Sequence, residues 1–230
     1  MKKTYVTGVR ALRSLLSTVG LLALLDRSAA RSRTALWVRS WLSIYDLHDM
    51  LRHDVPWWTF ESADQVERFL QQRPGARVFE WGSGASTVWL GQRAGEIISV
   101  EHDPQWAESM QPVLPANATL TVVPPTPGTG GVGSLKKGFE GLDFTDYVQS
   151  IDSTHGDFDL IVIDGRAREA CLPKALAKLA PGGMVVFDNV DRERYRAAIE
   201  QAGPVHVTWT RGLTPSLPYP TRTALIRQAA

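Results

Sequence analysis

The stretch Val78-Phe-Glu-Trp-Gly-Ser-Gly-Ala-Ser-Thr87 decides the fold of this chain. Its first half predicts a buried strand that ends in an acid, and its second half predicts a glycine turn that follows at once. Glycine adopts backbone dihedral angles that are closed to other residues and lets the main chain approach a ligand closely. The stretch therefore predicts a ligand site at the end of a strand.

A second predicted strand, within residues 96–103, also ends in acid. Its Glu101 lies 17 residues after Gly84, which fits one strand–helix–strand step that returns to the same edge of a parallel sheet. A carboxylate at that edge can accept hydrogen bonds from both hydroxyls of a ribose. Together the two segments predict a pocket for a cofactor that contains a nucleoside.

The glycine pattern separates two classes of cofactor. A dinucleotide fold carries G-x-G-x-x-G against a pyrophosphate, whereas here two glycines are followed by Ala85-Ser-Thr87. Glu80 precedes the first glycine, where it would repel a pyrophosphate and suit a ligand with a cationic end. S-adenosylmethionine (SAM) has an ammonium group, a sulfonium group and no phosphate.

These residues resemble the class I SAM-dependent methyltransferases, whose first motif is E/D-x-G-x-G and whose second strand ends in a ribose-binding acid. The resemblance covers residues 57–227. It implies an α/β fold with a doubly wound, mostly parallel Rossmann-like sheet and an antiparallel last strand, to which this chain adds N-terminal helices. It also implies a set of cofactor-binding residues. They are Glu80, Trp81, Gly82, Ser83, Gly84, Ser86, Thr87, Glu101, His102 and Asp164.

Two further predicted strands bring polar residues to the same edge. Residues 158–163 suit a strand buried on both faces and end at Asp164, and residues 184–187 end at Asp188 and Asn189. Oxygen ligands of this kind could hold Mg²⁺, which prefers octahedral oxygen coordination. The trio resembles the metal site of catechol-type O-methyltransferases, in which the metal binds both oxygens of a vicinal diol. Alternatively, Asp188 and Asn189 bind no metal and form only a polar strand end and a helix cap.

The chain departs from that family at the catalytic lysine, three residues after the first Asp, where Ala167 stands. Arg166 and Arg168 flank this position, and an arginine is effectively never a base. We expect Asp164 and Arg166 to be the catalytic residues, because Arg166 stays near the strand end and could bind an anionic acceptor by bidentate contact. The alternative for Arg168 is a solvated helix residue.

Length, charge and cysteine content agree with one enzyme domain. The chain has 230 residues, enough for one α/β domain with a sizeable core. Its net charge is +1, so it lacks the basic excess that nucleic-acid binding needs, and we expect no nucleic-acid partner. The single cysteine, Cys171, rules out an internal disulfide and fits a reducing compartment, so we expect a cytoplasmic protein.

Residues 1–56 are expected to be a helical extension of a catalytic domain formed by residues 57–230. Residues 15–25 are uncharged and largely apolar and follow basic residues, an outline that resembles a signal peptide. These eleven residues are too few to span a bilayer, and Leu12, Leu15 and Val19 recur at helical spacing. We expect the extension to roof the active site or to form a homodimer contact, and we favour both over contact with a membrane surface.

The function that these patterns indicate is methyl transfer from SAM. We expect a Mg²⁺-assisted O-methyltransferase that acts on a small molecule such as a sugar, polyol or secondary metabolite. The Pro- and Gly-rich residues 124–134 are expected to form a lid or an acceptor-site loop, with a floppy insertion as the alternative. A metal-independent O- or N-methyltransferase and a noncatalytic nucleotide-binding protein on the same fold are the competing functions.

Overall fold

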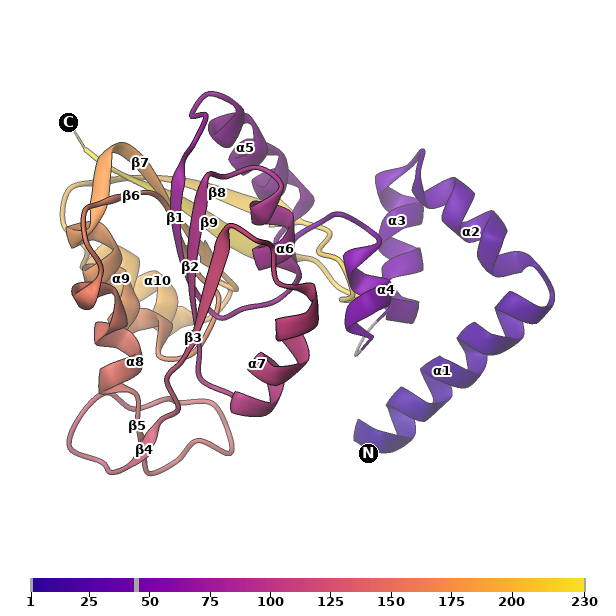
Figure 1. Cartoon of the computed structure of the whole chain (residues 1–230), viewed down its shortest axis with the longest axis horizontal. Coiled ribbons are helices and arrows are strands. Elements are labelled where there is room, and N and C mark those ends of the chain that lie inside the picture. The colour runs from indigo at the N-terminus through magenta and orange to yellow at the C-terminus, as the bar shows by residue number, and fades with distance from the viewer. Residues whose placement is uncertain (1, 44–45, 230) are drawn as a thin grey trace.

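The computed structural model describes residues 2–43 and 46–229 and is built around one seven-stranded sheet (Figure 1). The strands lie in the order β3-β2-β1-β6-β7-β9-β8. Their bounds are β1 (Arg77–Trp81), β2 (Glu96–Glu101), β3 (Ala118–Val122), β6 (Phe158–Ile163), β7 (Leu179–Asp188), β8 (Val205–Gly212) and β9 (Thr221–Gln228).

The pairing of the strands confirms the predicted fold class. The pairs β2–β3, β1–β2, β1–β6 and β6–β7 are parallel, whereas β9 runs antiparallel to both β7 and β8. The chain order reverses between β1 and β6, since β1 leads outward to β2 and β3 and the chain then returns to β6. Ligands of open α/β sheets bind at the carboxyl ends of the strands beside such a reversal.

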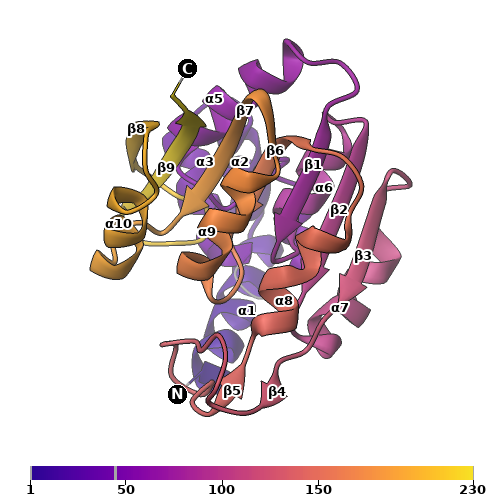
Figure 2. The same cartoon turned by 90° about the vertical axis from the view of Figure 1, so that its left-hand side faces the viewer.

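Helices cover both faces of the sheet (Figures 1 and 2). The helices on one face are α8 (Thr145–Gln149), α9 (Arg168–Ala177) and α10 (Glu193–Glu200), and those on the other face are α5 (Phe60–Gln71), α6 (Ala85–Gly91) and α7 (Pro104–Met110). Alternate residues of β6 enter two separate cores: Ile161 and Ile163 pack with α9, and Leu160 and Val162 pack with α5. The apolar run of this strand is therefore buried on both faces, as predicted.

The N-terminal segment is helical, as predicted, and stands beside α5 and α6 (Figure 1). It consists of α1 (Lys2–Thr18), α2 (Leu21–Ala29), α3 (Arg33–Ser40), the 3₁₀ turn η1 (Trp41–Ser43) and α4 (Leu47–Leu51). Arg39 of α3 is 1% exposed and forms a bidentate pair with Asp49 of α4, with both N···O distances at 2.9 Å. A buried charge is tolerated when it is paired in this way, so the pair fixes α3 against α4.

The segment is also tied to the loop between β8 and β9. Trp37 Nε1 donates to the main-chain oxygen of Leu217 at 2.7 Å, and Ser40 Oγ accepts from the main-chain N–H of Ser216 at 2.7 Å. Residues 124–134 were predicted to be an irregular loop, but β4 (Thr126–Pro127) within them pairs with β5 (Leu142–Asp143) in a small antiparallel sheet. Both loops reach the carboxyl ends of the parallel strands.

Candidate functional site

A cavity of about 680 Å³ lies at the carboxyl ends of the parallel strands, where the chain order reverses. Its walls come from the glycine turn after β1, the ends of β2, β6 and β7, the loop that carries Phe139, and residues 214–217 of the β8–β9 loop. Met50 of α4 and Trp57 close one side. The volume is typical of a small-molecule or cofactor site.

A second cavity, of about 660 Å³, lies between the N-terminal helices and α5. Its charged lining is largely paired: Arg93 contacts Asp54 and Glu67, and Arg33 contacts Asp64. It contains no predicted site residue and lies away from the strand ends. The chemistry therefore belongs to the cavity at the sheet edge.

The turn after β1 needs glycine at its first position. Gly82 has φ of +97°, and a Cβ atom added there would meet the main-chain N and Cα of Gly165 at 2.8 Å. Asp164 N donates to Trp81 O at 3.0 Å and so holds the ends of β6 and β1 together, while Gly82 N donates to Val100 O of β2 at 2.8 Å. Gly84 lines the cavity, and a Cβ there would meet no atom within 4 Å. This open position leaves room for a ligand against the main chain.

Glu80 lies behind the turn and does not face the cavity. Its carboxylate is fully buried and accepts hydrogen bonds from the hydroxyls of Ser86, Thr87 and Ser99. Burial raises the pKa of Glu80 to about 7, although the three hydroxyl donors oppose the rise. The predicted direct contact of Glu80 with the cationic end of the cofactor is therefore corrected: Glu80 ties the turn to α6 and β2.

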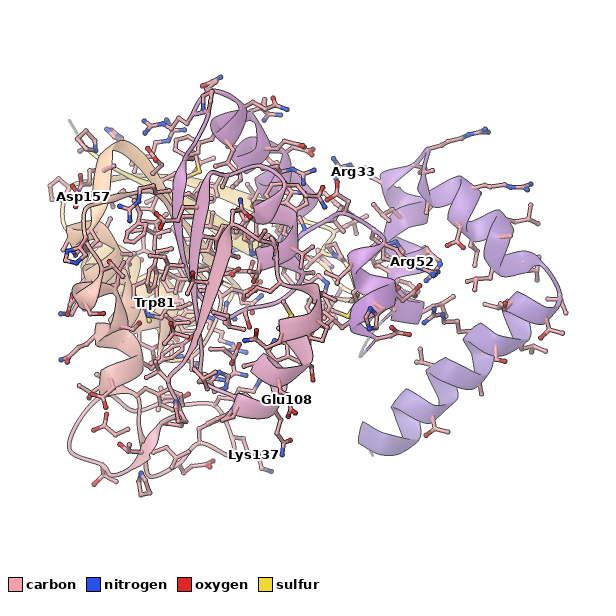
Figure 3. All side chains as sticks on the ribbon, in the orientation of Figure 1. Arg33, Arg52, Trp81, Glu108, Lys137 and Asp157 are labelled. Atoms are coloured by element: carbon pink, nitrogen blue, oxygen red, sulfur yellow. The ribbon has the colours of Figure 1, made fainter. Side chains whose placement is uncertain are left out.

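The predicted cofactor contacts of Trp81 and Thr87 need the same correction. Trp81 is fully buried, its indole N–H donates to Tyr147 O at 2.9 Å, and Figure 3 shows it inside the molecule. Thr87 Oγ1 accepts from the main-chain N–H of Gly84 at 3.0 Å. Trp81 points into the core because the side chains of β1 alternate between the two faces of the sheet. Thr87 lies in the first turn of α6 and supports the glycine turn through its bond to Gly84.

Glu101 occupies the position predicted for the ribose acid and lines the cavity. One carboxylate oxygen accepts from the main-chain N–H and hydroxyl of Ser83, both at 3.1 Å, and the other from the main-chain N–H groups of His102 and Asp103 at 2.8 and 2.9 Å. Burial alone would raise the pKa of Glu101, but His102, whose Nδ1 lies 2.6 Å away, and these main-chain donors hold the pKa below its usual value. An ionised acceptor thus stands at the cavity wall.

Aromatic rings form the wall next to Glu101. The His102 ring lies 5.5 Å from the Phe139 ring and 6.0 Å from that of Tyr147, measured between centroids. Trp106 lines the opposite side and donates its indole N–H to Ser83 O at 2.8 Å. Aromatic rings beside an acid that can bind ribose hydroxyls suit a nucleoside, so the residues fit SAM.

Arg168 binds the ends of β6 and β7, which form the half of the site away from Glu101. Its side chain is buried, and its Nη2 lies 2.7 Å from Asp164 Oδ1. The same guanidinium donates to the main-chain oxygens of Asp164 and Asp188 at 2.7 Å and of Gly165 at 3.0 Å. The alternative of a solvated Arg168 is wrong, because α9 begins at the strand end and turns this side chain back under it.

Asp164, Asp188 and Asn189 converge as predicted, but their arrangement does not fit a divalent cation. Arg168 brings a positive charge to both carboxylates, at 2.7 Å from Asp164 and 4.0 Å from Asp188. The oxygens of Asp188 accept from the Thr223 hydroxyl and from the Asn189 amide, each at 2.6 Å. Among the described residues, no three His, Cys, Asp or Glu side chains form a group that could hold a metal ion.

The carboxylates of this half have raised pKa values. Burial raises the pKa of Asp164, while the charges of Arg168 and Arg166 oppose the rise. Burial and the nearby charge of Asp164 raise the pKa of Asp188 to about 7. A carboxylate with a raised pKa is a better proton acceptor than an ordinary Asp, so the site contains a candidate general base.

Arg166 lines the cavity and differs from Arg168 in having no carboxylate partner. No ion pair of Arg166 within 4 Å is found in the described part of the chain, and its buried Nε has no hydrogen-bond partner there. Burial and the charge of Arg168 lower the pKa of Arg166. Its guanidinium lies over the Phe139 ring, 5.2 Å from the centroid. An anion could be accommodated beside it.

Ala167 stands where the resembled family has its lysine, and it points into the protein. It is 4% exposed and has φ of +47°, a left-handed conformation that costs a non-glycine residue about 1 kcal/mol or more. Asn189, at the end of β7, is left-handed as well, with φ of +58°. Both turns carry the chain sharply away from the strand ends, so that the main chain lines the site.

The structure brings most of the predicted site residues to the cavity. The residues that line it are Gly82, Ser83, Gly84, Ser86, Glu101, His102, Asp164, Arg166, Asp188 and Asn189. Sequence reasoning missed Met50 and Phe139, which reach the site from distant parts of the chain. It also undervalued Arg168, whose spacing of four residues from Asp164 was the available signal.

Comparisons with known proteins agree with this site. The sheet order and the cavity define an α/β protein that binds a nucleoside cofactor, and residues 79–190 match a family model described as a methyltransferase domain. A search among curated proteins found no match. The chain is a SAM-dependent methyltransferase with the class I fold.

Solved structures show the same fold at low sequence identity. A Klebsiella pneumoniae protein provisionally described as an O-methyltransferase is 20% identical, with 80% of this chain and 88% of that chain covered and a TM-score of 0.51. Cofactor-bound Rv0187 from MTB is 18% identical, with 81% and 90% covered and a TM-score of 0.52. Precorrin 8w decarboxylase from Methanobacterium thermoautotrophicum is 17% identical, with 76% and 94% covered and a TM-score of 0.52.

Proposed function

We propose that this methyltransferase transfers the methyl group to an oxygen of an anionic small molecule without the help of a divalent cation. The observation that carries the proposal is the Arg168 guanidinium, which lies between the main-chain and side-chain oxygens of Asp164 and Asp188. A divalent cation at the same oxygens would be repelled by that charge. The proposal replaces the Mg²⁺-assisted transfer expected from the sequence.

The cofactor half of the site performs binding and alignment. Bound SAM supplies an electrophilic methyl group on sulfur, and alignment with the acceptor can contribute several kcal/mol, up to about 10. We infer that Glu101 accepts hydrogen bonds from the ribose hydroxyls and that His102 and Phe139 pack near the base. The open space at Gly84 takes the amino-acid part of the cofactor.

Asp164 is proposed to remove the proton of the acceptor hydroxyl. Its carboxylate lines the cavity, and burial raises its pKa toward the range in which a base accepts a proton efficiently. Arg168 is a positioning residue, since its bond to Oδ1 fixes the orientation of the carboxylate. Its charge also favours negative charge that develops on a nearby acceptor oxygen.

The acceptor is proposed to carry a carboxylate or phosphate that pairs with Arg166. Burying an arginine without a carboxylate partner costs free energy unless another anion pairs with its charge. The net charge of +1 and the cavity volume of about 680 Å³ favour a small molecule over a nucleic acid. We place the enzyme in the cytoplasm, where its cofactor is made.

The test is methyl transfer from labelled SAM to a panel of hydroxy acids, matched uncharged alcohols and matched amines. Turnover should persist in excess EDTA, should favour the hydroxy acids, and should drop on Arg166→Gln while binding of S-adenosylhomocysteine persists. Loss of turnover in EDTA with recovery in Mg²⁺ would reject the metal-free mechanism. Preference for the amines would reject oxygen as the acceptor atom, and equal use of alcohols and acids would reject the role of Arg166.

A further inference from the structure

The helices α1 and α2 form an arm that the active site does not use. They project away from the sheet (Figure 1), and they meet the rest of the molecule through α3, through η1 and through the ion pairs of Arg13 with Asp46 and Asp49 at α4. Within the described part of the chain, α2 contains no buried residue. The catalytic domain therefore does not cover the apolar side chains of this arm.

The apolar side chains of the arm are exposed at helical spacing. Leu12, Leu15 and Val19 of the α1 end are 48%, 61% and 57% exposed, and Leu21 and Leu24 of α2 are 47% and 55% exposed. The other large exposed hydrophobic residues lie singly on separate elements, as Leu135 and Trp209 do. Single exposed apolar residues are ordinary, but four on two consecutive helices and a fifth in the turn between them mark a contact surface.

The charge of the arm is opposite to that of the rest of the chain. Residues 1–33 contain seven Lys or Arg and one Asp, whereas residues 34–230 contain eighteen Lys or Arg and 23 Asp or Glu. The one acid, Asp26, is paired with Arg39 at 2.6 Å. Arg27 and Arg31 are exposed, and neither forms an ion pair with any residue that the structure describes. The arm is thus both apolar and basic.

We propose that the arm binds the surface of an anionic lipid bilayer, with its leucines in the headgroup boundary and its basic residues at lipid phosphates. Basic helices with an apolar face bind in this way, and each Lys or Arg near an anionic surface strengthens the binding. No single described helix is long and apolar enough to cross a membrane, and the pair Thr7–Thr18 and Leu21–Ala29 is bent by 97°. A bent pair with exposed apolar residues on both limbs suits attachment to a surface.

Charge argues against a second copy of the chain as the occupant. A twofold contact brings the same surface of both copies together. It would place two strongly basic arms against each other, and their positive charges would repel. A contact between the arm and the body of another copy would need an apolar patch on that body, and the exposed hydrophobic residues there are scattered. An anionic bilayer can bind both the apolar and the basic side chains of the arm, because it offers an apolar boundary beside negatively charged phosphates.

The test is flotation of the full-length protein with vesicles of phosphatidylcholine alone or mixed with phosphatidylglycerol. The wild type should bind the anionic vesicles at least about tenfold more strongly, and high salt should weaken binding. Leu15→Glu with Leu24→Glu should abolish binding, and Arg27→Glu with Arg31→Glu should reduce it about tenfold or more. Leu135→Glu, at a side chain that is 76% exposed outside the arm, is the matched control and should bind like the wild type.

Each variant is also tested for binding of S-adenosylhomocysteine, which reports a folded domain independently of the arm. Loss of vesicle binding with cofactor binding retained supports the proposal. Equal binding to neutral vesicles, or no binding by the wild type, would overturn it. A dimer in light scattering that the double leucine variant dissociates, without vesicle binding by the wild type, would assign the arm to a second copy instead.

Discussion

Asp164 and Arg168, four residues apart at the end of β6 and the start of α9, form an ion pair with an Nη2–Oδ1 distance of 2.7 Å. The left-handed Ala167 between them turns the chain so that Arg168 points back beneath the strand end. The guanidinium also holds the main-chain oxygens of Asp164 and Asp188. One buried side chain therefore joins the ends of two neighbouring strands.

We predict that Asp164→Asn lowers kcat by about 10² to 10⁴, because the amide keeps the shape of the side chain and cannot accept the proton. In the wild type, kcat/KM should fall as the pH falls through a pKa above the ordinary Asp value, since burial raises the pKa of Asp164 and only the ionised form is a base. A pH–rate profile checks this. Retention of full activity by the variant would exclude Asp164 as the base.

Glu101→Gln should weaken binding of S-adenosylhomocysteine by about 1 to 3 kcal/mol, because a ribose hydroxyl would lose an ionised acceptor. Calorimetry measures the loss. Glu108→Gln is the matched control, since Glu108 is exposed on α7 and should have no effect on affinity. Equal affinities of the Glu101 variant and the control would show that the ribose lies elsewhere.

The two glycines of the turn should respond differently to alanine. Gly82→Ala should destabilise the fold by about 1 to 3 kcal/mol, because φ is +97° and the new Cβ would meet Gly165 main-chain atoms at 2.8 Å. Gly84→Ala should leave stability near that of the wild type, because its Cβ meets no protein atom within 4 Å, but it should weaken cofactor binding. Denaturant unfolding and calorimetry together separate the two effects, and identical behaviour of the variants would contradict them.

Glu80 should make the stability of the fold depend on pH. Its folded pKa of about 7 lies above the ordinary value of 4.5, so the folded state holds the proton more tightly. This contribution to stability is present at low pH and is lost as the pH rises from about 5 to about 8. We predict that, between pH about 5 and about 8, the free energy of unfolding of Glu80→Gln increases by about 2 to 3 kcal/mol relative to that of the wild type. Urea unfolding at a series of pH values measures this difference. A constant difference between the two proteins would show that the pKa of Glu80 is not raised.

The sequence predicted the strands and the residues at their ends well, because those signals are local. The four apolar residues before Asp164 favour a strand buried on both faces, and the glycines after Glu80 favour a turn. Boundaries were less accurate. Residues 62–65 have the S-x-x-Q form of a capping box, which predicts a helix start at Ser62, whereas α5 begins at Phe60 with Thr59 as its N-cap. Thr59 Oγ1 bonds both Ser62 and Thr210 of β8, and a contact across 151 residues is absent from local sequence.

The sequence by itself predicted the buried strands, the glycine turn and the acids at the strand ends, because these signals come from residues close together in the chain, and the family resemblance implied the parallel sheet at whose edge Glu101, Asp164 and Asp188 meet. Only the tertiary structure decided what these acids face. Glu80 turns to three buried hydroxyls instead of a ligand, and Arg168 lies against two strand ends where a cation was expected. The direction of a side chain and the charge beside it depend on which elements pack together, and that is set by the whole fold.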